Sequence, residues 1–280
     1  MSVPDRTAVQ VALWRAQHLV VDGPPHVLDD DIGRLLVAPG DDWLTRSGMG
    51  ERYARRWRAS VVARARLVDD LIAELMSHGL NQYVLLGAGL DTFALRRSDL
   101  GNRLRVFELD RPATQEWKHA RLSELNLTFP AGLVFVPFDF ELGRSWIGAL
   151  AAQGFDTRAP ALVASTGVAQ YIGIEALRTT MQQTASLASG TCFVCSFVLR
   201  AELIDPAEAD VRAETEAAAA AGGHPWVSTY APSEIAALAH EAGFGRVEHV
   251  SSSDLERRYF ASRADDLRPS SSEALIIAFV

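Results

Sequence analysis

The fold is decided by QYVLLGAGLDT (residues 82–92) and by RVFELD (105–110), which follows it. Both contain short, near-continuous apolar runs, as expected for strands of a parallel sheet that is covered on both faces. After the first run, Gly87 and Gly89 let the backbone turn sharply and let amide groups at a helix start face a ligand. The pair therefore predicts a strand–loop–helix–strand unit with a binding site at the strand ends.

Similar apolar runs recur along the chain and alternate with helical or loop stretches. Helices are predicted over residues 174–189, before Gly190, and over 232–242, between Pro232 and Gly243. This alternation favours an α/β fold with a doubly wound, mostly parallel, Rossmann-like sheet. The further predicted strands are LVFVPFDF (133–140), ALVASTG (161–167), TCFVCSFV (191–198) and EALIIAFV (273–280).

The rest of the chain is predicted to be mainly helical. The first 80 residues are expected to form a helical cap, and the Ala- and Glu-rich stretch 200–223 a helical insertion after the fifth strand. No repeat or long linker divides the sequence, so we expect a single domain. Its parts are a cap (1–80), a cofactor-binding core (81–198), an insertion or lid (199–230) and a C-terminal completion of the sheet (231–280).

Composition limits the partners of this 280-residue chain. Its 27 Lys and Arg against 35 Asp and Glu give a net charge of -8, which provides no broad attraction to nucleic acid or to an anionic membrane. There is no signal-like segment and no apolar run long enough to span a bilayer. We expect a cytoplasmic monomer or homodimer that acts on a small molecule.

The two cysteines, Cys192 and Cys195, have the C-x-x-C spacing of redox and metal sites. They lie within a predicted strand, however, where positions three apart face opposite sides of the sheet. We therefore expect two buried core thiols and no metal site.

Local residues indicate which ligand the glycine loop holds. A dinucleotide-binding loop has Gly or Ala where this chain has Thr92. Asp91 would repel a pyrophosphate but favours a cationic ligand such as a sulfonium amino acid. About 20 residues beyond the loop, Asp110 can accept hydrogen bonds from ribose hydroxyls. If the loop instead held a dinucleotide, the protein would be an oxidoreductase with a nucleotide cofactor, which is the alternative from another enzyme class.

After the third predicted strand, Asp139 could accept a hydrogen bond from an adenine amino group, with Phe140 lining the ring. A helix N-cap is the structural alternative for Asp139.

Several blocks together resemble the leucine carboxyl methyltransferase superfamily, including its bacterial secondary-metabolite and polyketide O-methyltransferases. The resemblance implies a class I methyltransferase fold and S-adenosyl-L-methionine as cofactor. It covers most of the chain, through ARARLVDDLI, VLLGAGLDT, VFELDRP, FDF, TGVAQYI, PWVSTYAPSEIAALAHEAGF and ERRYFASRADDLRPSS.

The resemblance also implies roles for individual residues. Arg64 would bind the donor's carboxylate, a bidentate task suited to a guanidinium. Thr166 stands where the family usually has Glu, and Phe93 where bacterial relatives commonly have Arg. The complete set of expected cofactor contacts is Arg64, Gly87, Ala88, Gly89, Asp91, Glu108, Asp110, Asp139, Phe140, Thr166 and Gly167.

The acceptor side is less defined by the sequence. A carboxyl or hydroxyl oxygen is expected, with a carbon or nitrogen of an aromatic ring such as indole as the alternative. A carboxylate needs no base, whereas a phenol gains from a nearby His or Tyr.

Candidate catalytic residues are Tyr171, His224 and Tyr230. Candidate substrate contacts are Trp14, Arg15, His18 and Trp226. Together with Trp57, the tryptophans among them suit a flat aromatic acceptor. His119 is expected on a solvated helix.

Overall fold

The computed structural model describes residues 5–140 and 145–280. Its centre is a seven-stranded sheet in the order β3-β2-β1-β4-β5-β7-β6. Strands β1 to β5 are parallel, and β7 is antiparallel to both β5 and β6. The strands are β1 (Gln82–Leu86), β2 (Arg105–Asp110), β3 (Leu133–Pro137), β4 (Leu162–Ser165), β5 (Cys192–Val198), β6 (Arg246–Val250) and β7 (Glu273–Phe279).

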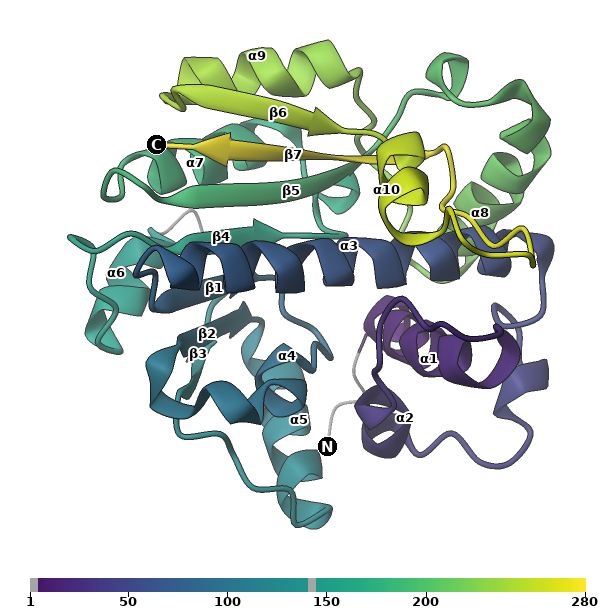
Figure 1. The fold of residues 1–280 in the computed structure, drawn as a ribbon, viewed down its shortest axis with the longest axis horizontal. Helices are drawn as coiled ribbons and strands as arrows, with labels where there is room; N and C mark the ends of the chain where they lie inside the picture. The colour runs from purple at the N-terminus through teal and green to yellow at the C-terminus, as the bar shows by residue number, and fades with distance from the viewer. Residues whose placement is uncertain (1–4, 141–144) are drawn as a thin grey trace.

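Helices cover both faces of the sheet (Figure 1). One face packs against α3 (Arg52–Ser77), α4 (Phe93–Arg96) and α10 (Ser252–Tyr259). The opposite face packs against α6 (Trp146–Ala152), α7 (Ile174–Ala185) and α9 (Pro232–Ala242). The remaining helices are α1 (Arg6–Val21), α2 (Ile32–Val37), α5 (Pro112–Glu124) and α8 (Ala209–Ala221). The doubly wound, mostly parallel α/β fold is therefore confirmed.

The longest helix, α3, joins the predicted cap to the sheet. Its first half packs Tyr53, Trp57 and Val61 against α1 in a separate apolar cluster. Its second half places Leu67 and Ile72 on the sheet. In Figure 1, α3 runs across the front of the sheet with α1 and α2 beside its first half. One rigid element thus positions the cap over the sheet.

The predicted elements differ from the structure mainly at their ends. Strand β3 stops at Pro137, three residues early, because its neighbour β2 ends at Asp110, whose backbone oxygen accepts the last bond across the pair, from Phe138 N at 2.8 Å. Helix α7 stops at Ala185 rather than at residue 189. The predicted insertion contains two short 3-10 turns, η5 (Ala201–Leu203) and η6 (Pro206–Glu208), before α8. Strand β6 has no apolar run because it is a half-exposed edge strand, and it was not predicted.

The cysteines occupy opposite faces of β5, as predicted. Cys192 lies in one core cluster and Cys195 in the other, and both are free and fully buried. Burial raises the pKa of each thiol to about 12, which makes them unreactive. Within the described residues, no cluster of three His, Cys, Asp or Glu is placed to hold a metal.

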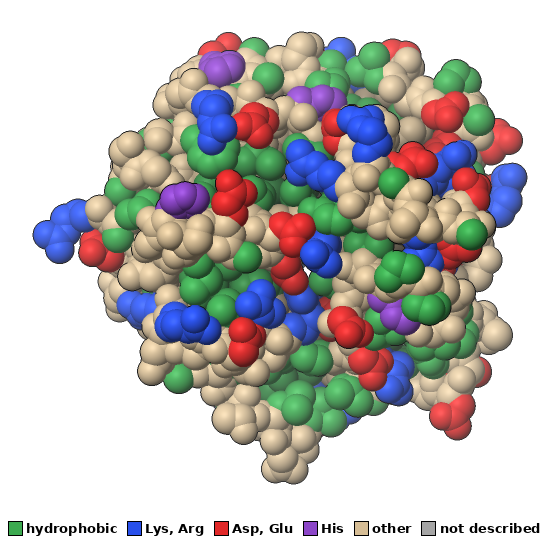
Figure 2. All heavy atoms as spheres, viewed as in Figure 1, with side chains coloured by type: hydrophobic (Ala, Val, Ile, Leu, Met, Phe, Trp, Pro, Cys, Tyr) green, Lys and Arg blue, Asp and Glu red, His purple; other side chains and the backbone are tan. Residues whose placement is uncertain are grey.

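The surface seen in Figure 2 carries interspersed acidic and basic side chains rather than a large area of one sign. In the described ranges, every helix is too short or too polar to cross a membrane.

Candidate functional site

A large cavity opens at the carboxyl ends of β1, β2 and β4, where the strand order of the sheet reverses. This is the edge at which open α/β sheets bind their ligands. Its volume is about 1280 Å³, above the roughly 1,000 Å³ at the upper end for a single drug-sized ligand. The cavity therefore has room for two ligands side by side.

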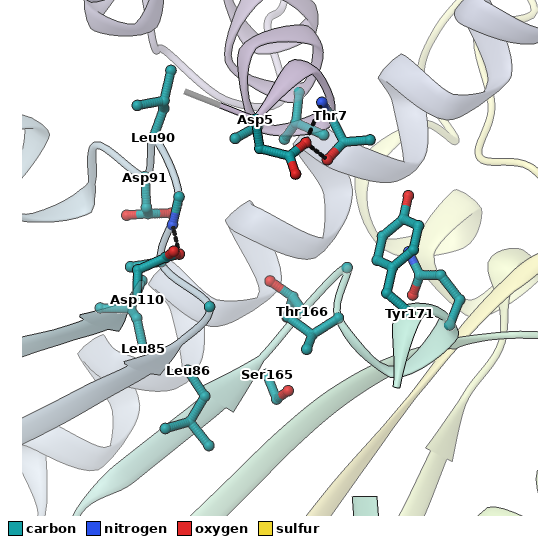
Figure 3. A pocket seen from close by; sticks show the side chains of 18 of the residues that line it. Asp5, Thr7, Leu85, Leu86, Leu90, Asp91, Asp110, Ser165, Thr166 and Tyr171 are labelled. Atoms are coloured by element: carbon teal, nitrogen blue, oxygen red, sulfur yellow. Dashed lines mark hydrogen bonds between the residues drawn. The ribbon is translucent and has the colours of Figure 1, made fainter. Parts of the chain in front are cut away.

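The glycine loop forms one wall and is tied to β2. Gly87 has φ +74°, and a Cβ there would lie 2.7 Å from Val168 Cγ2. Gly89 N donates to Asp110 Oδ2 at 2.7 Å (Figure 3). Asp110 Oδ1 accepts from Arg111 N at 2.7 Å. Each carboxylate oxygen retains a second lone pair, so Asp110 can still accept from a bound hydroxyl.

Asp91 also lines the cavity. Its Oδ1 accepts from Phe93 N at 2.7 Å, and its backbone oxygen accepts from Lys118 Nζ at 2.6 Å. The carboxylate thus braces the start of α4 while placing a negative charge beside the loop.

Arg64 reaches the cavity from α3 and is held there by a residue that the sequence did not predict. Its Nη1 donates to Glu273 Oε1 at 2.5 Å, and both side chains are buried. Its Nη2 lies against Gly167, where a Cβ would be only 2.8 Å away. Glu273 is the first residue of β7, 209 positions from Arg64, and no local pattern links the two.

The ends of β3 and β4 complete the half of the cavity that lies beside the glycine loop. Asp139 and Phe140 line it after β3, with the Phe140 ring 5.0 Å from Phe138. Thr166 and Gly167 line it after β4, and Gly167 N donates to Ser196 Oγ at 2.8 Å. In Figure 3, Thr166 lies between the Asp110 side and the Tyr171 side of the cavity.

The other half of the cavity is mainly aromatic. Trp14 of α1, Trp57 of α3 and Trp226, which follows α8, all line it. Trp57 and Trp226 are in contact at 5.7 Å between ring centroids. The indole N–H groups of Trp14 and Trp57 donate to Gly48 O (2.8 Å) and Thr215 Oγ1 (2.9 Å). With these polar edges satisfied, the rings present apolar surface.

Three further predicted residues line the cavity. Tyr171, in the 3-10 turn η4 (Ala169–Tyr171), lines the cavity together with His224. Arg15 also lines it, but its side chain is already engaged, with Nε on Asp30 Oδ2 at 2.6 Å and Nη2 on Leu90 O at 2.7 Å. Arg15 therefore ties the cap to the glycine loop rather than offering a free charge.

Glu108, predicted as a cofactor contact, lies outside the cavity. Its carboxylate is 2.5 Å from Lys118 Nζ, and both groups are buried. Burial raises the pKa of Glu108 to about 7, although the Lys118 ammonium opposes the rise. The side chain is therefore committed to the packing of α5 on β2.

Two predicted acceptor-side residues also lie outside the cavity. His18 is fully buried, with Nδ1 2.9 Å from Asp22 and Nε2 accepting from Val27 N at 2.9 Å. Tyr230 belongs to the apolar core between α9 and the sheet. Both expectations fail because these side chains face the interior of the fold. His119 is exposed on α5, as predicted.

The donor half fits S-adenosyl-L-methionine. The loop has no room for a side chain at Gly87, an acidic acceptor follows β2 at Asp110, and a buried guanidinium stands opposite at Arg64. These groups match a carboxylate, a ribose and a methionyl chain that must pass close to the backbone. Strand order and site together define a class I S-adenosylmethionine-dependent methyltransferase.

Comparison with known proteins identifies the family. A model of the leucine carboxyl methyltransferase family matches residues 8–185, and the chain belongs to this family. Over 214 residues it is 33% identical to a Bacillus subtilis protein named "Putative S-adenosyl-L-methionine-dependent methyltransferase YktD", covering 74% of this chain and 67% of that protein. A Frankia alni protein with the same description, FRAAL3718, is 30% identical over 189 residues. These matches cover about two thirds of each relative's length (67% and 64%).

Solved structures show the same fold at low sequence identity. A DUF574 family protein from Streptomyces avermitilis superposes with a TM-score of 0.63 at 16% identity, covering 99% of this chain and 97% of that one. A structure from Thermobifida fusca described as a "putative methyltransferase" has a TM-score of 0.59 at 17% identity, covering 99% of this chain and 94% of that one.

Proposed function

We propose that this methyltransferase acts on a small aromatic acceptor of secondary metabolism and methylates it at a carboxyl or hydroxyl oxygen. The observation that carries the proposal is the division of one cavity into a polar half, beside the glycine loop, and an aromatic half, beneath the cap. A flat ring would stack on the tryptophans while the donor occupies the polar half. Methylation of a ring carbon or nitrogen is the second candidate, since the same walls would hold an indole.

The proposed roles follow from position and chemistry. Arg64, braced by Glu273, would bind the donor's carboxylate, and Asp110 would accept from the ribose hydroxyls. Asp139 and Phe140 would hold the adenine. Thr166 and Asp91 would line the methionyl end, next to Gly87, Ala88, Gly89 and Gly167.

When bound, S-adenosyl-L-methionine supplies an electrophilic methyl group on a cationic sulfonium. The protein's own contribution is alignment of the acceptor and exclusion of water, because charge is dispersed rather than created as the methyl moves. Residues of α1, of α3 and of the segment after α8 line the cavity, and their role in this proposal is to limit the access of water to the bound acceptor.

Calorimetry with S-adenosylhomocysteine tests the donor half. We expect Arg64→Ala and Asp110→Ala each to weaken binding at least about tenfold, or about 1.4 kcal/mol. Arg66→Ala is the matched control, because Arg66 is an exposed residue of the same helix that pairs with Asp70. Unchanged affinity in folded Arg64 and Asp110 variants, or binding of NADH in place of S-adenosylhomocysteine, would overturn the assignment.

The acceptor half is tested by incubating the protein with donor and a panel of aromatic and aliphatic carboxylates, phenols and indoles. Mass spectrometry detects the added methyl group, and NMR locates it on oxygen, carbon or nitrogen. Methylation confined to aliphatic acceptors would contradict the proposed aromatic pocket.

A further inference from the structure

The single lysine of this chain is buried against the glycine loop. Of the 27 Lys and Arg in the sequence, only Lys118 is a lysine. It lies on α5, and its Nζ donates to Asp91 O at 2.6 Å and to Glu108 Oε2 at 2.5 Å. The side chains of Lys118 and Glu108 are only 1% and 2% exposed. A compact ammonium with three rotatable donors suits two acceptors that lie in different directions, and here it links the loop to β2.

Two consecutive carbonyl groups of the loop are held by buried cations. Leu90 O accepts from Arg15 Nη2, and Asp91 O accepts from Lys118 Nζ. Because each peptide unit is planar, a fixed carbonyl also fixes the direction of the N–H group in the same unit. Leu90 and Asp91 both line the cavity (Figure 3). Lys118 and Glu108 are not among the described residues that line it, so they act on a bound ligand through the loop.

Glu108 sets the charge balance of this contact. Burial raises its pKa to about 7, against the opposing charge and hydrogen bond of Lys118. The negative charges of Asp91, in the loop, and of Asp110, on the same strand, add to the rise in pKa. A further titratable group beside it is Tyr83 of β1, whose own pKa burial raises well above the usual value, so this phenol stays neutral. Around neutral pH, Glu108 therefore exchanges between a carboxylate and a neutral acid.

Protonation of Glu108 weakens the hold of Lys118 on the loop. As a carboxylate, Glu108 makes a charge-assisted hydrogen bond that keeps the ammonium in its buried position. As a neutral acid, it leaves the ammonium buried without its paired anion, which is costly. The ammonium then gains by turning toward water or by losing its proton. Either change weakens its bond to Asp91 O, and the loop loses one of its two fixed carbonyl groups.

We propose that Lys118 and Glu108 are positioning residues that shape the glycine loop for the methyl donor, and that the loop binds the donor best when Glu108 is ionised. The proposal rests on the proposed assignment of the loop to S-adenosyl-L-methionine. A donor that prefers the ionised form also lowers the pKa of Glu108 when it binds. Donor affinity is therefore highest above pH 7 and decreases as the pH falls through the pKa of Glu108.

NMR of the wild-type protein, labelled with carbon-13 at the lysine ε-carbon, tests this coupling without an acceptor. Because the chain has one lysine, the single side-chain signal belongs to Lys118. We expect its position to follow the ionisation of Glu108, with a midpoint near pH 7. Added S-adenosylhomocysteine should move the midpoint to lower pH, and Glu108→Gln should abolish it. A signal without a midpoint in this range, or a midpoint that S-adenosylhomocysteine leaves in place, would overturn the proposal.

Calorimetry at two pH values measures the effect on binding. Between about pH 8 and about pH 6, wild-type affinity for S-adenosylhomocysteine should fall at least about threefold, as a roughly fivefold coupling to Glu108 predicts. In Glu108→Gln the amide oxygen still accepts from Lys118 but does not titrate, so this pH dependence should disappear. Glu124→Gln, at the exposed end of α5, is the matched control and should behave as the wild type does. The same pH dependence in Glu108→Gln as in the wild type would contradict the proposal.

The double variant Glu108→Gln/Lys118→Met separates positioning from packing. It replaces the buried ion pair by neutral side chains of similar size, an exchange that folded proteins tolerate, and thermal unfolding checks that it folds. Because Asp91 O loses its donor, we expect affinity for S-adenosylhomocysteine to fall at least about fivefold at about pH 8. Wild-type affinity in the folded double variant would mean that the pair serves packing alone. Failure of the proposed function is distinguishable, since the wild type would then bind no S-adenosylhomocysteine at either pH.

Discussion

At the scale of single residues, the position of the Arg64 guanidinium on the cavity wall depends on the residues around it. The Arg64 guanidinium is fixed between Glu273 and the backbone at Gly167. Gly167 has φ +73°, which favours glycine. A side chain here would lie 2.8 Å from Arg64 Nη2, so the guanidinium would have to shift against its buried ion pair with Glu273. The movement would displace the guanidinium from the cavity wall, so ligand binding should weaken as well.

Gly167→Ala is therefore expected to weaken S-adenosylhomocysteine binding at least about tenfold and to lower stability by more than backbone strain alone, because the Arg64–Glu273 pair is then strained. Gly79→Ala is the matched control, because Gly79 has φ +94° but no atom within 4 Å of its Cβ position. Both variants carry the same kind of backbone strain, about 1 kcal/mol, which thermal unfolding measures. Equal donor affinity in the two variants would contradict the proposed position of Arg64.

The residues that could be predicted from the sequence are those whose partners are close along the chain. Gly87, Gly89 and Asp110 belong to one β–α–β unit, and their spacing alone predicted a ligand site. Glu273 and the ion pair of Asp5 with His224 could not be predicted, because these contacts cross most of the chain and leave no periodic pattern. Glu108 was misassigned because a strand-end position does not reveal that a lysine of the next helix neutralises it.

At the scale of elements, apolar runs predicted the central strands well because β1, β4 and β5 are buried on both faces. The same criterion missed β6, whose residues are mostly exposed at the sheet edge. Helix α9 was predicted to its last residue because Pro232 begins it and Gly243, at φ +114°, ends it. A stop signal directly beside the helix thus fixed the end of α9, whereas Gly190, five residues beyond Ala185, did not mark the end of α7.

The docking of α1 on α3 depends on a buried ionic cluster. Asp22 ends α1 and accepts from Arg58 of α3 through both oxygens, at 2.7 and 2.8 Å, and from His18 at 2.9 Å. Burial alone would raise the pKa of Asp22, but the hydrogen bonds from His18 and Arg58 outweigh it and lower the value to about 2. The folded state therefore gains stability from the ionised carboxylate.

Asp22→Asn is expected to destabilise the protein by about 3 kcal/mol at neutral pH, because it leaves Arg58 buried without its anion. The unfolded carboxyl titrates near 3.8 and the folded one near 2, so the wild type should lose this advantage as pH falls through that window. Urea unfolding at several pH values, followed by tryptophan fluorescence, measures the difference between the two proteins.

Asp31→Asn provides the control for this comparison, because Asp31 pairs with Arg34 on the surface. Exposed pairs contribute about 0–1 kcal/mol. If Asp22→Asn behaved like Asp31→Asn, or if its effect did not change between neutral pH and pH 3, the ionised cluster would not be what holds α1 on α3.

At the scale of the whole molecule, the cap and the cofactor loop form one connected structure. Asp30, which follows α1, is buried and accepts from Arg15 Nε (2.6 Å) and from Thr92 Oγ1 (2.5 Å). Arg15 also donates to Leu90 O. The charges of Arg15 and Arg96 and the Thr92 hydrogen bond hold the pKa of Asp30 below its usual value, against the effect of burial. The carboxylate thus stays charged and joins the cap to the glycine loop that lines the cavity.

This connection predicts that ligand binding at the loop is felt in the cap. We expect S-adenosylhomocysteine to slow amide hydrogen exchange in the glycine loop and also across α1, because ordering the loop fixes the carbonyl and hydroxyl that Arg15 and Asp30 bind. Arg15→Met keeps an apolar side chain on α1 but removes the link, so protection should persist in the loop and vanish from α1. Helix α9, on the opposite face of the sheet, serves as the internal reference.

Protection of α1 that survives Arg15→Met would mean that the ligand orders the cap by touching it directly. Protection confined to the loop in the wild type would mean that donor and acceptor sites close independently.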